Sequence, residues 1–220
     1  MPKYYKLTDA NDQTYGGCQW GEGVTHLISG EGNLCGPGWT HWYTHPLLAV
    51  MLNPTQGNFD LTTAHLWESP ADQVAEKTDH GLKVGCMKGT TVRRVPLPEV
   101  TLTQKIAFGI LCSLEVCTEQ SYVTWANNWL LDIDRSQRTA AWTVWTAGET
   151  VWAARAARAA WVAAGAAWVA AGAAGMAKVA VGATEVAEVA AGAARAAWMA
   201  AQNKPLSLIR LAKKAMKVKP

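Results

Sequence analysis

The stretch RAARAAWVAAGAAWVAAGAAGMAKVAVGATEVAEVAAGAARAAWMAA, residues 155–201, decides how this chain is expected to fold. It lies within an alanine-rich segment, residues 141–202, that contains no proline. Alanine has the highest intrinsic helix propensity, whereas an internal proline breaks a helix. The segment is therefore predicted to be a long α-helical stem, either extended or folded back on itself as a helical hairpin near residues 172–175.

The residues of this segment that are not alanine recur at intervals of seven. One series runs from Val151 to Val186, and a second series, three positions later in phase, runs from Trp161 to Val189. This a/d spacing has a period of 3.5 residues and favours a left-handed supercoil of packed helices. The two series predict a helix-packing stripe that includes Val151, Trp161, Gly165, Trp168, Gly172, Val179, Gly182, Val186 and Val189.

Glycine within this stripe requires an explanation, because glycine costs about 1 kcal/mol relative to alanine inside a helix. Glycine beside tryptophan could form holes for the tryptophans of a partner, or small residues could let two helix backbones approach closely. The remaining alternative is drift of a low-complexity sequence. The outer faces of the predicted helix carry few charges, which indicates packing on more than one side by a partner chain, a return arm or a larger assembly.

No membrane span is expected. Residues 159–177 contain no charge and have about the length that a bilayer requires. They consist mostly of alanine and glycine, however, and lack the leucine, isoleucine and phenylalanine that favour insertion.

The rest of the chain predicts an α+β head, residues 1–138, before the stem at 139–202 and a C-terminal tail at 203–220. Short alternating segments rich in β-branched and aromatic residues come first, and longer apolar-periodic segments follow, which is typical of α+β domains. A hairpin is expected around Lys88-Gly89, and Thr101 or Thr103 is expected to cap a helix. Strands are expected at 3–8, 24–28, 39–43, 61–67, 82–87 and 90–96, and helices at 46–53, 100–117 and 121–131.

The five cysteines include no CxxC motif, and the first residues lack the apolar run of a secretory leader. This pattern predicts reduced thiols in a cytosolic setting. The formal net charge of the chain is +3, but the charge is uneven, because residues 203–220 contain basic residues and no acidic residue.

The tail combines these basic residues with an apolar strip formed by Leu208, Ile209, Leu211, Ala212 and Met216. Two interpretations remain open: a frayed, solubilising terminus, or a surface that docks on an acidic partner such as nucleic acid, an acidic protein face or an anionic membrane. The tail has no aromatic residue that could stack on bases, so sequence-specific recognition is not expected. The residues expected to bind an acidic partner are Lys204, Arg210, Lys213, Lys214, Lys217 and Lys219.

His26, His41 and His45 mark an alternative ligand pocket in the head, beside glycine-rich loops. Together with Cys35 they match no zinc-ligand spacing, and neither of the phosphate-binding glycine motifs is present. Asp132 and Asp134 are expected to cap a helix rather than to catalyse a reaction. The sequence therefore predicts no catalytic residue, no metal and no cofactor.

The run Cys35-Gly36-Pro37-Gly38-Trp39, with His41 after it, is similar to the entry to the sheet of ADP-ribosyltransferases. That resemblance implies that His26 or His41 would bind the ribose of NAD and that a tyrosine would stack on nicotinamide. The nearest candidate for a catalytic glutamate is Glu99, which lies between Pro98 and a predicted helix rather than after a late strand.

The head also resembles a group of uncharacterised proteins of tailed phages and bacteria over about residues 15–136. The resemblance is carried by WGEGVTH at 20–26, LCGPGW at 34–39 with His41, PLLAV at 46–50, LNP at 52–54, WANNWL at 125–130 and DRS at 134–136. An alanine-rich tail of varying length is usual in that group. The resemblance implies a phage or prophage origin and no particular activity.

Together these features predict a non-enzymatic structural or interaction protein. It would assemble through its Ala/Gly/Trp stem as a coiled-coil homo-oligomer or within a larger protein assembly, in the cytoplasm of a host cell or in a virion. The alternative is an NAD-binding, ADP-ribosyltransferase-like enzyme in the head.

Overall fold

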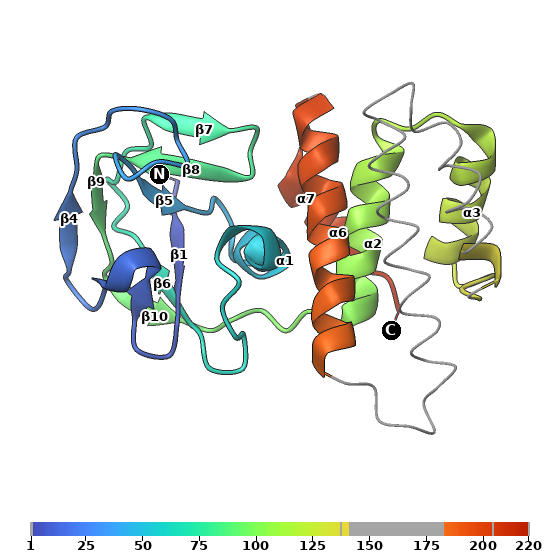
Figure 1. Ribbon diagram of the computed structural model, residues 1–220, viewed down its shortest axis with the longest axis horizontal. Coiled ribbons are helices and arrows are strands. Elements are labelled where there is room, and N and C mark those ends of the chain that lie inside the picture. Colours follow the sequence, from blue (N-terminus) through green and yellow to red (C-terminus); the bar gives the residue numbers. More distant parts are fainter. Residues whose placement is uncertain (1, 137, 141–182, 204, 220) are drawn as a thin grey trace. The chain divides into compact units, whose positions relative to one another are not determined.

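The computed structural model describes residues 2–136, 138–140, 183–203 and 205–219 (Figure 1). In this part of the chain the fold is mixed α+β, as the sequence predicts. The chain divides into two compact units, Met1–Glu99 and Val100–Pro220. The boundaries at 138 and 202 stay predictions. The predicted site residues that lie outside the described residues are Val151, Trp161, Gly165, Trp168, Gly172, Val179, Gly182 and Lys204.

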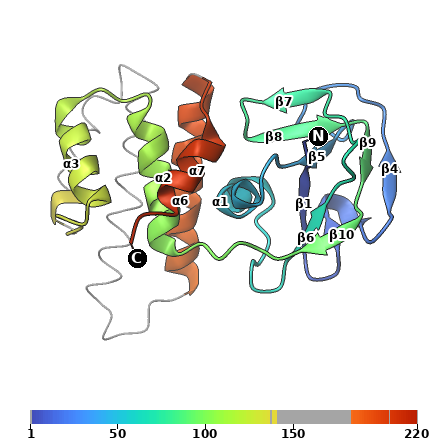
Figure 2. The ribbon, with the colours of Figure 1, turned by 180° about the vertical axis from the view of Figure 1, so that it is seen from behind.

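Two three-stranded antiparallel sheets form the framework of the first unit (Figures 1 and 2). One has the order β1-β6-β10 and the other the order β5-β8-β7. Tyr5 and Tyr43 join them, because the N–H of each donates to the carbonyl of the other at 2.8 Å. The strands are β1 (Tyr5–Thr8), β6 (His65–Glu68), β10 (Arg93–Val95), β5 (Thr40–Trp42), β8 (Lys83–Cys86) and β7 (Lys77–Asp79).

Two shorter ladders and a helix complete this unit. Strands β2 (Gln13–Thr14) and β3 (Cys18–Gln19) flank a 3-10 turn, η1 (Tyr15–Gly17), and β4 (Thr25–Leu27) pairs with β9 (Lys88–Thr90). Helix α1 (Pro46–Gln56) begins at the expected residue but continues past Pro54, where the sequence predicts its end. Only two residues of the helix follow Pro54, so the proline shifts the end of the helix by a few residues from the expected one.

The hairpin expected around Lys88-Gly89 is wrong. Strand β8 pairs with β5 and β7, and β9 pairs with β4. The hairpin turn lies instead at His80 and Gly81, between β7 and β8, where the φ angles are 48° and 80°. Positive φ at both central residues is typical of a type I′ turn, whose twist matches the strands that it joins.

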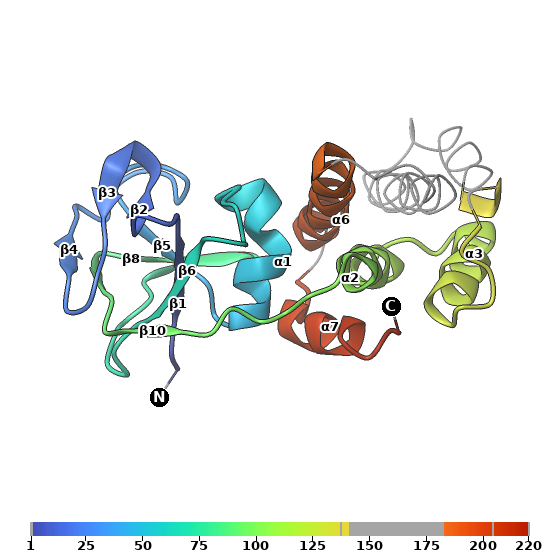
Figure 3. The same ribbon diagram turned by 90° about the horizontal axis from the view of Figure 1, so that it is seen from below.

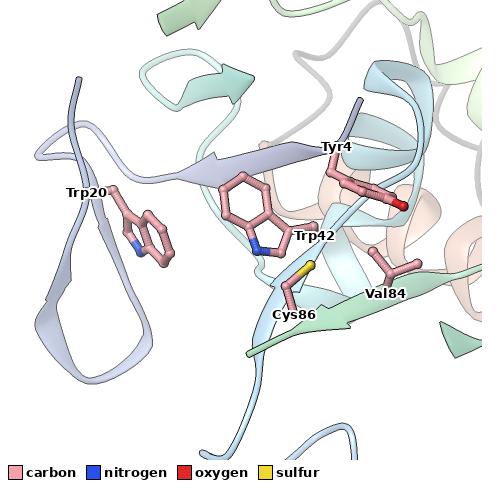
Figure 4. Packing of buried hydrophobic residues seen from close by; sticks show 5 residues of the cluster. All are labelled: Tyr4, Trp20, Trp42, Val84 and Cys86. Atoms are coloured by element: carbon pink, nitrogen blue, oxygen red, sulfur yellow. The ribbon is translucent and has the colours of Figure 1, made fainter. Parts of the chain in front are cut away.

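Aromatic side chains fill the core of the first unit. Tyr4, Trp20, Trp42, Val84 and Cys86 form one buried cluster (Figure 4). The rings of Trp20 and Trp42 meet edge to face at an interplanar angle of 87°, with their centroids 5.5 Å apart. This geometry places the positive edge of one ring against the negative face of the other.

The second unit is organised around α2 (Leu102–Leu114). Thr101 is its N-cap: its hydroxyl accepts from the N–H of Gln104, and the Gln104 side chain accepts from the N–H of Thr101. Every residue from 106 to 113 is buried, so the helix is covered on all sides. It lies between α3 (Gln120–Leu130) and the pair α6 (Ala183–Asn203) and α7 (Leu208–Ala215), as Figure 3 shows.

Small residues set the distance between α2 and α6. A Cβ atom placed on Gly109 would lie 2.9 Å from the carbonyl oxygen of Ala193 and 3.0 Å from its Cα. Only glycine therefore permits this approach of the two backbones without a shift. Among the residues of α6 whose burial the structure describes, the buried ones are Val189, Ala193, Ala194, Ala196, Ala197, Ala200 and Ala201.

Candidate functional site

The three histidines of the predicted ligand pocket occupy different places in the first unit. His45 is the N-cap of α1, where its Nδ1 accepts a hydrogen bond of 3.1 Å from the N–H of Leu47. His41 lies in β5, and its Nε2 donates to the carbonyl of Leu34. Burial lowers the pKa of His41, despite that hydrogen bond, and the charges of Lys83 and Lys6 lower it further.

His26 lies on the opposite side of β5 from His41. Its ring centroid is 4.5 Å from that of Trp20, which in turn contacts Trp42. Trp42 follows His41 directly in the strand, and successive side chains of a strand point to opposite faces. The structure therefore does not bring His26 and His41 together in one pocket.

The thiol of Cys18 lies close to the imidazole ring of His26. The Sγ of Cys18 lies 3.7 Å from Nε2 of His26 and 4.0 Å from Nδ1. Nε2 also makes a hydrogen bond of 2.7 Å to the carbonyl of Gln19, for which Nε2 must be the donor. These contacts hold the ring of His26 in β4 against residues of β3. Across the described residues, no group of three or more His, Cys, Asp or Glu side chains is arranged to hold a metal ion.

Lys6 is a buried cation that sequence reasoning missed. Only 6 % of the residue is exposed, and its Nζ donates to the carbonyl of His41 at 3.0 Å. The same Nζ lies 4.3 Å from the ring centroid of Trp20 and 5.4 Å from that of Trp42. Burial lowers the pKa of Lys6 to about 8, against the opposing effect of Cys18 and Cys86.

These contacts give Lys6 a structural role. Indole rings attract a cation through their negative faces, and a buried ammonium needs such compensation for lost hydration. An amine with this pKa could act as a nucleophile, but its ammonium is enclosed by two tryptophans and a carbonyl. Lys6 and Leu7 are adjacent and both buried, so both faces of β1 are covered. The alternation of polar and apolar residues along the strand could not reveal that Lys6 is buried. The high tryptophan content of the chain was the one signal of an aromatic core that could enclose a cation.

Asp12 is the centre of a second polar cluster that sequence reasoning missed. One of its carboxylate oxygens accepts from Nδ1 of His65 at 2.8 Å and from Nε1 of Trp67 at 3.0 Å, and the other accepts from Arg94. Burial would raise the pKa of Asp12, but the hydrogen bonds from these three residues outweigh it and the pKa is lowered. The carboxylate of Asp12 thus links the turn that carries it to β6 and β10. Its oxygens accept their hydrogen bonds from side chains of the same unit.

The C-terminal tail forms a helix with two distinct faces. Leu208, Leu211, Ala212 and Ala215 of α7 are buried, at spacings of i, i+3, i+4 and i+7. Arg210, Lys213, Lys214 and Lys217 repeat the same spacing two residues later and are exposed. We call these four residues, together with Lys219, the basic stripe.

Few contacts neutralise the basic stripe. Arg210 pairs with Glu115 of the second unit at 2.8 Å. Within the part of the chain that the structure describes, no ion pair involves Lys213, Lys214, Lys217 or Lys219. Four of the five cations of the stripe are therefore exposed and form no ion pair with the described residues.

One end of the predicted helix-packing stripe lies within α6. Val189 is 1 % exposed, and the heptad positions that follow it, Ala193, Ala196 and Ala200, are buried as well. Val186 belongs to the same helix. Residues at these positions are thus buried in α6, and the helix that α6 contacts is α2 of the same chain. The packing role of the seven-residue spacing stays a prediction.

Comparison with known proteins finds no matching family model, no matching curated protein and no matching solved structure. A search of the described helices for one that is both long and apolar enough to cross a membrane finds none.

Proposed function

We propose that this chain is a non-enzymatic structural or interaction protein, of phage or prophage origin, that assembles through its Ala/Gly/Trp repeat. The observation that carries the proposal is the contact of α6 with α2. At Gly109 the two backbones approach so closely that a single methyl group would collide with Ala193. The repeat is therefore suited to pack helices at short range.

The chemistry of this contact supports assembly rather than catalysis. Alanine and glycine bury little apolar area per residue, so they stabilise a helix pair mainly through close backbone contact over many residues. The repeat continues in the sequence toward Val151 with the same spacing and adds Trp161 and Trp168. The proposal assigns contact with further copies of the chain to that part.

Sedimentation velocity over a concentration series tests the proposal. The parent chain is expected to self-associate, and the double variant Trp161→Ala/Trp168→Ala to shift toward the monomer. Trp198→Ala is the matched control, because Trp198 is 41 % exposed and lies off the stripe. A parent chain that stays monomeric at every concentration would overturn the proposal.

The NAD-binding, ADP-ribosyltransferase-like enzyme stays a prediction from the sequence. Its two candidate histidines lie on opposite sides of β5, and no described contact favours it over the interaction protein.

A further inference from the structure

The C-terminal tail, which is basic in sequence, forms an ordered basic surface in the structure. The apolar face of α7 is docked on α2. The chain after the helix is held as well: Nε2 of Gln104 donates to the carbonyl of Met216 and Nη1 of Arg135 donates to the carbonyl of Lys219, both at 3.1 Å. Backbone order is thus present before any partner binds, which lowers the entropic cost of binding.

Helix stability alone does not explain the charges. Lysines in the last turn interact favourably with the helix dipole, and that accounts for Lys213 and Lys214. Lys217 lies in the closing turn, where its N–H donates to the carbonyl of Lys214 at 3.1 Å, and Lys219 lies beyond it. These two cations extend the stripe past the helix without such a benefit.

The burial of the apolar face decides between the acidic partners. An amphipathic helix binds a membrane by inserting its apolar face into the lipid. In α7 most of that face is already buried and Ile209 is half-buried, so the exposed residues of the helix are all cations. The exposed face offers no aromatic or large aliphatic anchor of the kind that dominates protein interfaces. The partner that best suits a surface of positive charges without anchors is one that presents a regular row of phosphates.

We propose that the basic stripe docks on the sugar–phosphate backbone of a nucleic acid duplex without reading its sequence. From Arg210 to Lys217 the stripe extends about 10 Å, at about 1.5 Å per residue. Phosphates on one strand of B-DNA follow one another about every 3.4 Å along its axis, so the stripe spans several of them. Lys213, Lys214 and Lys217 make the contacts, while Arg210 is partly engaged by Glu115. This activity is separate from the self-association proposed above.

The test is fluorescence anisotropy of the full chain with a labelled duplex of arbitrary sequence, in a series of salt concentrations. For about three phosphate contacts the logarithm of the binding constant should fall with the logarithm of salt concentration with a slope of about −3. The triple variant Lys213→Gln/Lys214→Gln/Lys217→Gln should lose affinity on the order of a hundredfold at about 0.1 M salt, and most of that slope.

A control of equal charge separates the stripe from net charge. The triple variant Lys88→Gln/Arg138→Gln/Arg195→Gln removes the same charge from exposed residues off the stripe, and it should bind like the parent. Circular dichroism confirms that both variants are folded, and their sedimentation should equal that of the parent. Equal loss of affinity in both triple variants would overturn the proposal. Binding to anionic vesicles or to polyglutamate in the absence of duplex binding would overturn it too.

Discussion

The two units of this chain use lysine in opposite ways. In the first unit Lys6 points inward, with its ammonium against Trp20 and Trp42, and it is 6 % exposed. In the second unit Lys213, Lys214 and Lys217 point outward from a helix whose apolar face is buried. The buried ammonium of Lys6 loses hydration and is compensated only in part, by a carbonyl and two indole rings, whereas exposed cations that form no ion pair with the described residues can contact a partner. The docking proposed above for the basic stripe places the contact with a partner in the second unit.

The cores of the two units also differ in the size of the side chains at their closest contacts. The first unit is packed with large aromatic rings and polar clusters around Lys6 and Asp12. The second unit also buries aromatic rings, among them Tyr122 and Trp125, but the contact of α2 with α6 is formed by Gly109 and the alanines of α6, which bring the helix backbones close together. Substitutions at the two places should consequently act by different mechanisms: removal of a large side chain leaves a cavity in the aromatic core, whereas a methyl group added at Gly109 collides with α6.

The largest effect is expected for Trp42→Ala. Trp42 is 0 % exposed, supports the ring of Trp20 and forms one wall around Lys6. Its loss should lower the free energy of unfolding by about 3–5 kcal/mol. Chemical denaturation measures the change. The exposed Trp198 supplies the control, and a loss as small as that of Trp198→Ala would contradict the assignment of Trp42 to the core.

The variant Lys6→Met tests whether Lys6 is buried as a cation, through the pH dependence of the free energy of unfolding. The pKa of Lys6 falls from 10.5 to about 8 on folding. Between these values the unfolded chain binds more protons than the folded chain, so the Lys6 contribution to stability rises with pH. Below about pH 8 the parent bears the full unfavourable contribution, about 3 kcal/mol at about 1.4 kcal/mol per pKa unit.

The stability of Lys6→Met relative to the parent should therefore be greatest below about pH 8 and should decline by about pH 10.5. Only the difference between the two proteins isolates Lys6, because burial raises the pKa of Tyr43, Tyr122 and Cys112, and these groups oppose the trend. Urea unfolding of both proteins from pH 7 to 11 measures the difference. A difference that does not change with pH would show that Lys6 is not buried as a cation.

Gly109→Ala tests the close packing of the second unit. Alanine in place of glycine usually stabilises a helix by about 1 kcal/mol. Here the added methyl group collides with the backbone of Ala193, and overpacking costs about 1–3 kcal/mol. The variant should be less stable than the parent by about 1 kcal/mol. Ala193→Gly in the same background should give no rescue, because the collision involves backbone atoms. A stabilised Gly109→Ala variant would refute the close approach.

Thr101→Ala should have the smallest of these effects, about 1 kcal/mol, because it removes one half of the capping box of α2. Thr103, two residues later, makes no cap, so Thr103→Ala should change the free energy of unfolding by less. Thermal unfolding of the two variants compares them directly. Equal losses would mean that the cap does not stabilise α2.

Local signals in the sequence predicted much of the fold. The sequence left the cap of α2 open between Thr101 and Thr103, and Thr101 makes the capping box. The apolar strip expected in the tail is buried at Leu208, Leu211 and Ala212, whereas Ile209 and Met216 are only half-buried. The turn at His80-Gly81 was missed, because Lys88-Gly89 offered the same glycine signal and only long-range pairing distinguishes them. Lys6 and Asp12 were missed for a related reason: their partners come from distant strands, and no local pattern shows which cation a tryptophan core will enclose.

Lysine footprinting tests most directly whether the second unit is the binding part of the molecule. The full chain is acetylated with an amine-reactive reagent, with and without duplex DNA, and the rate at each lysine is read by mass spectrometry. DNA is predicted to slow the acetylation of Lys213, Lys214 and Lys217, while the rate at the exposed Lys88 of the first unit stays the same. Equal protection of Lys88 and the stripe, or protection of Lys88 alone, would contradict the account.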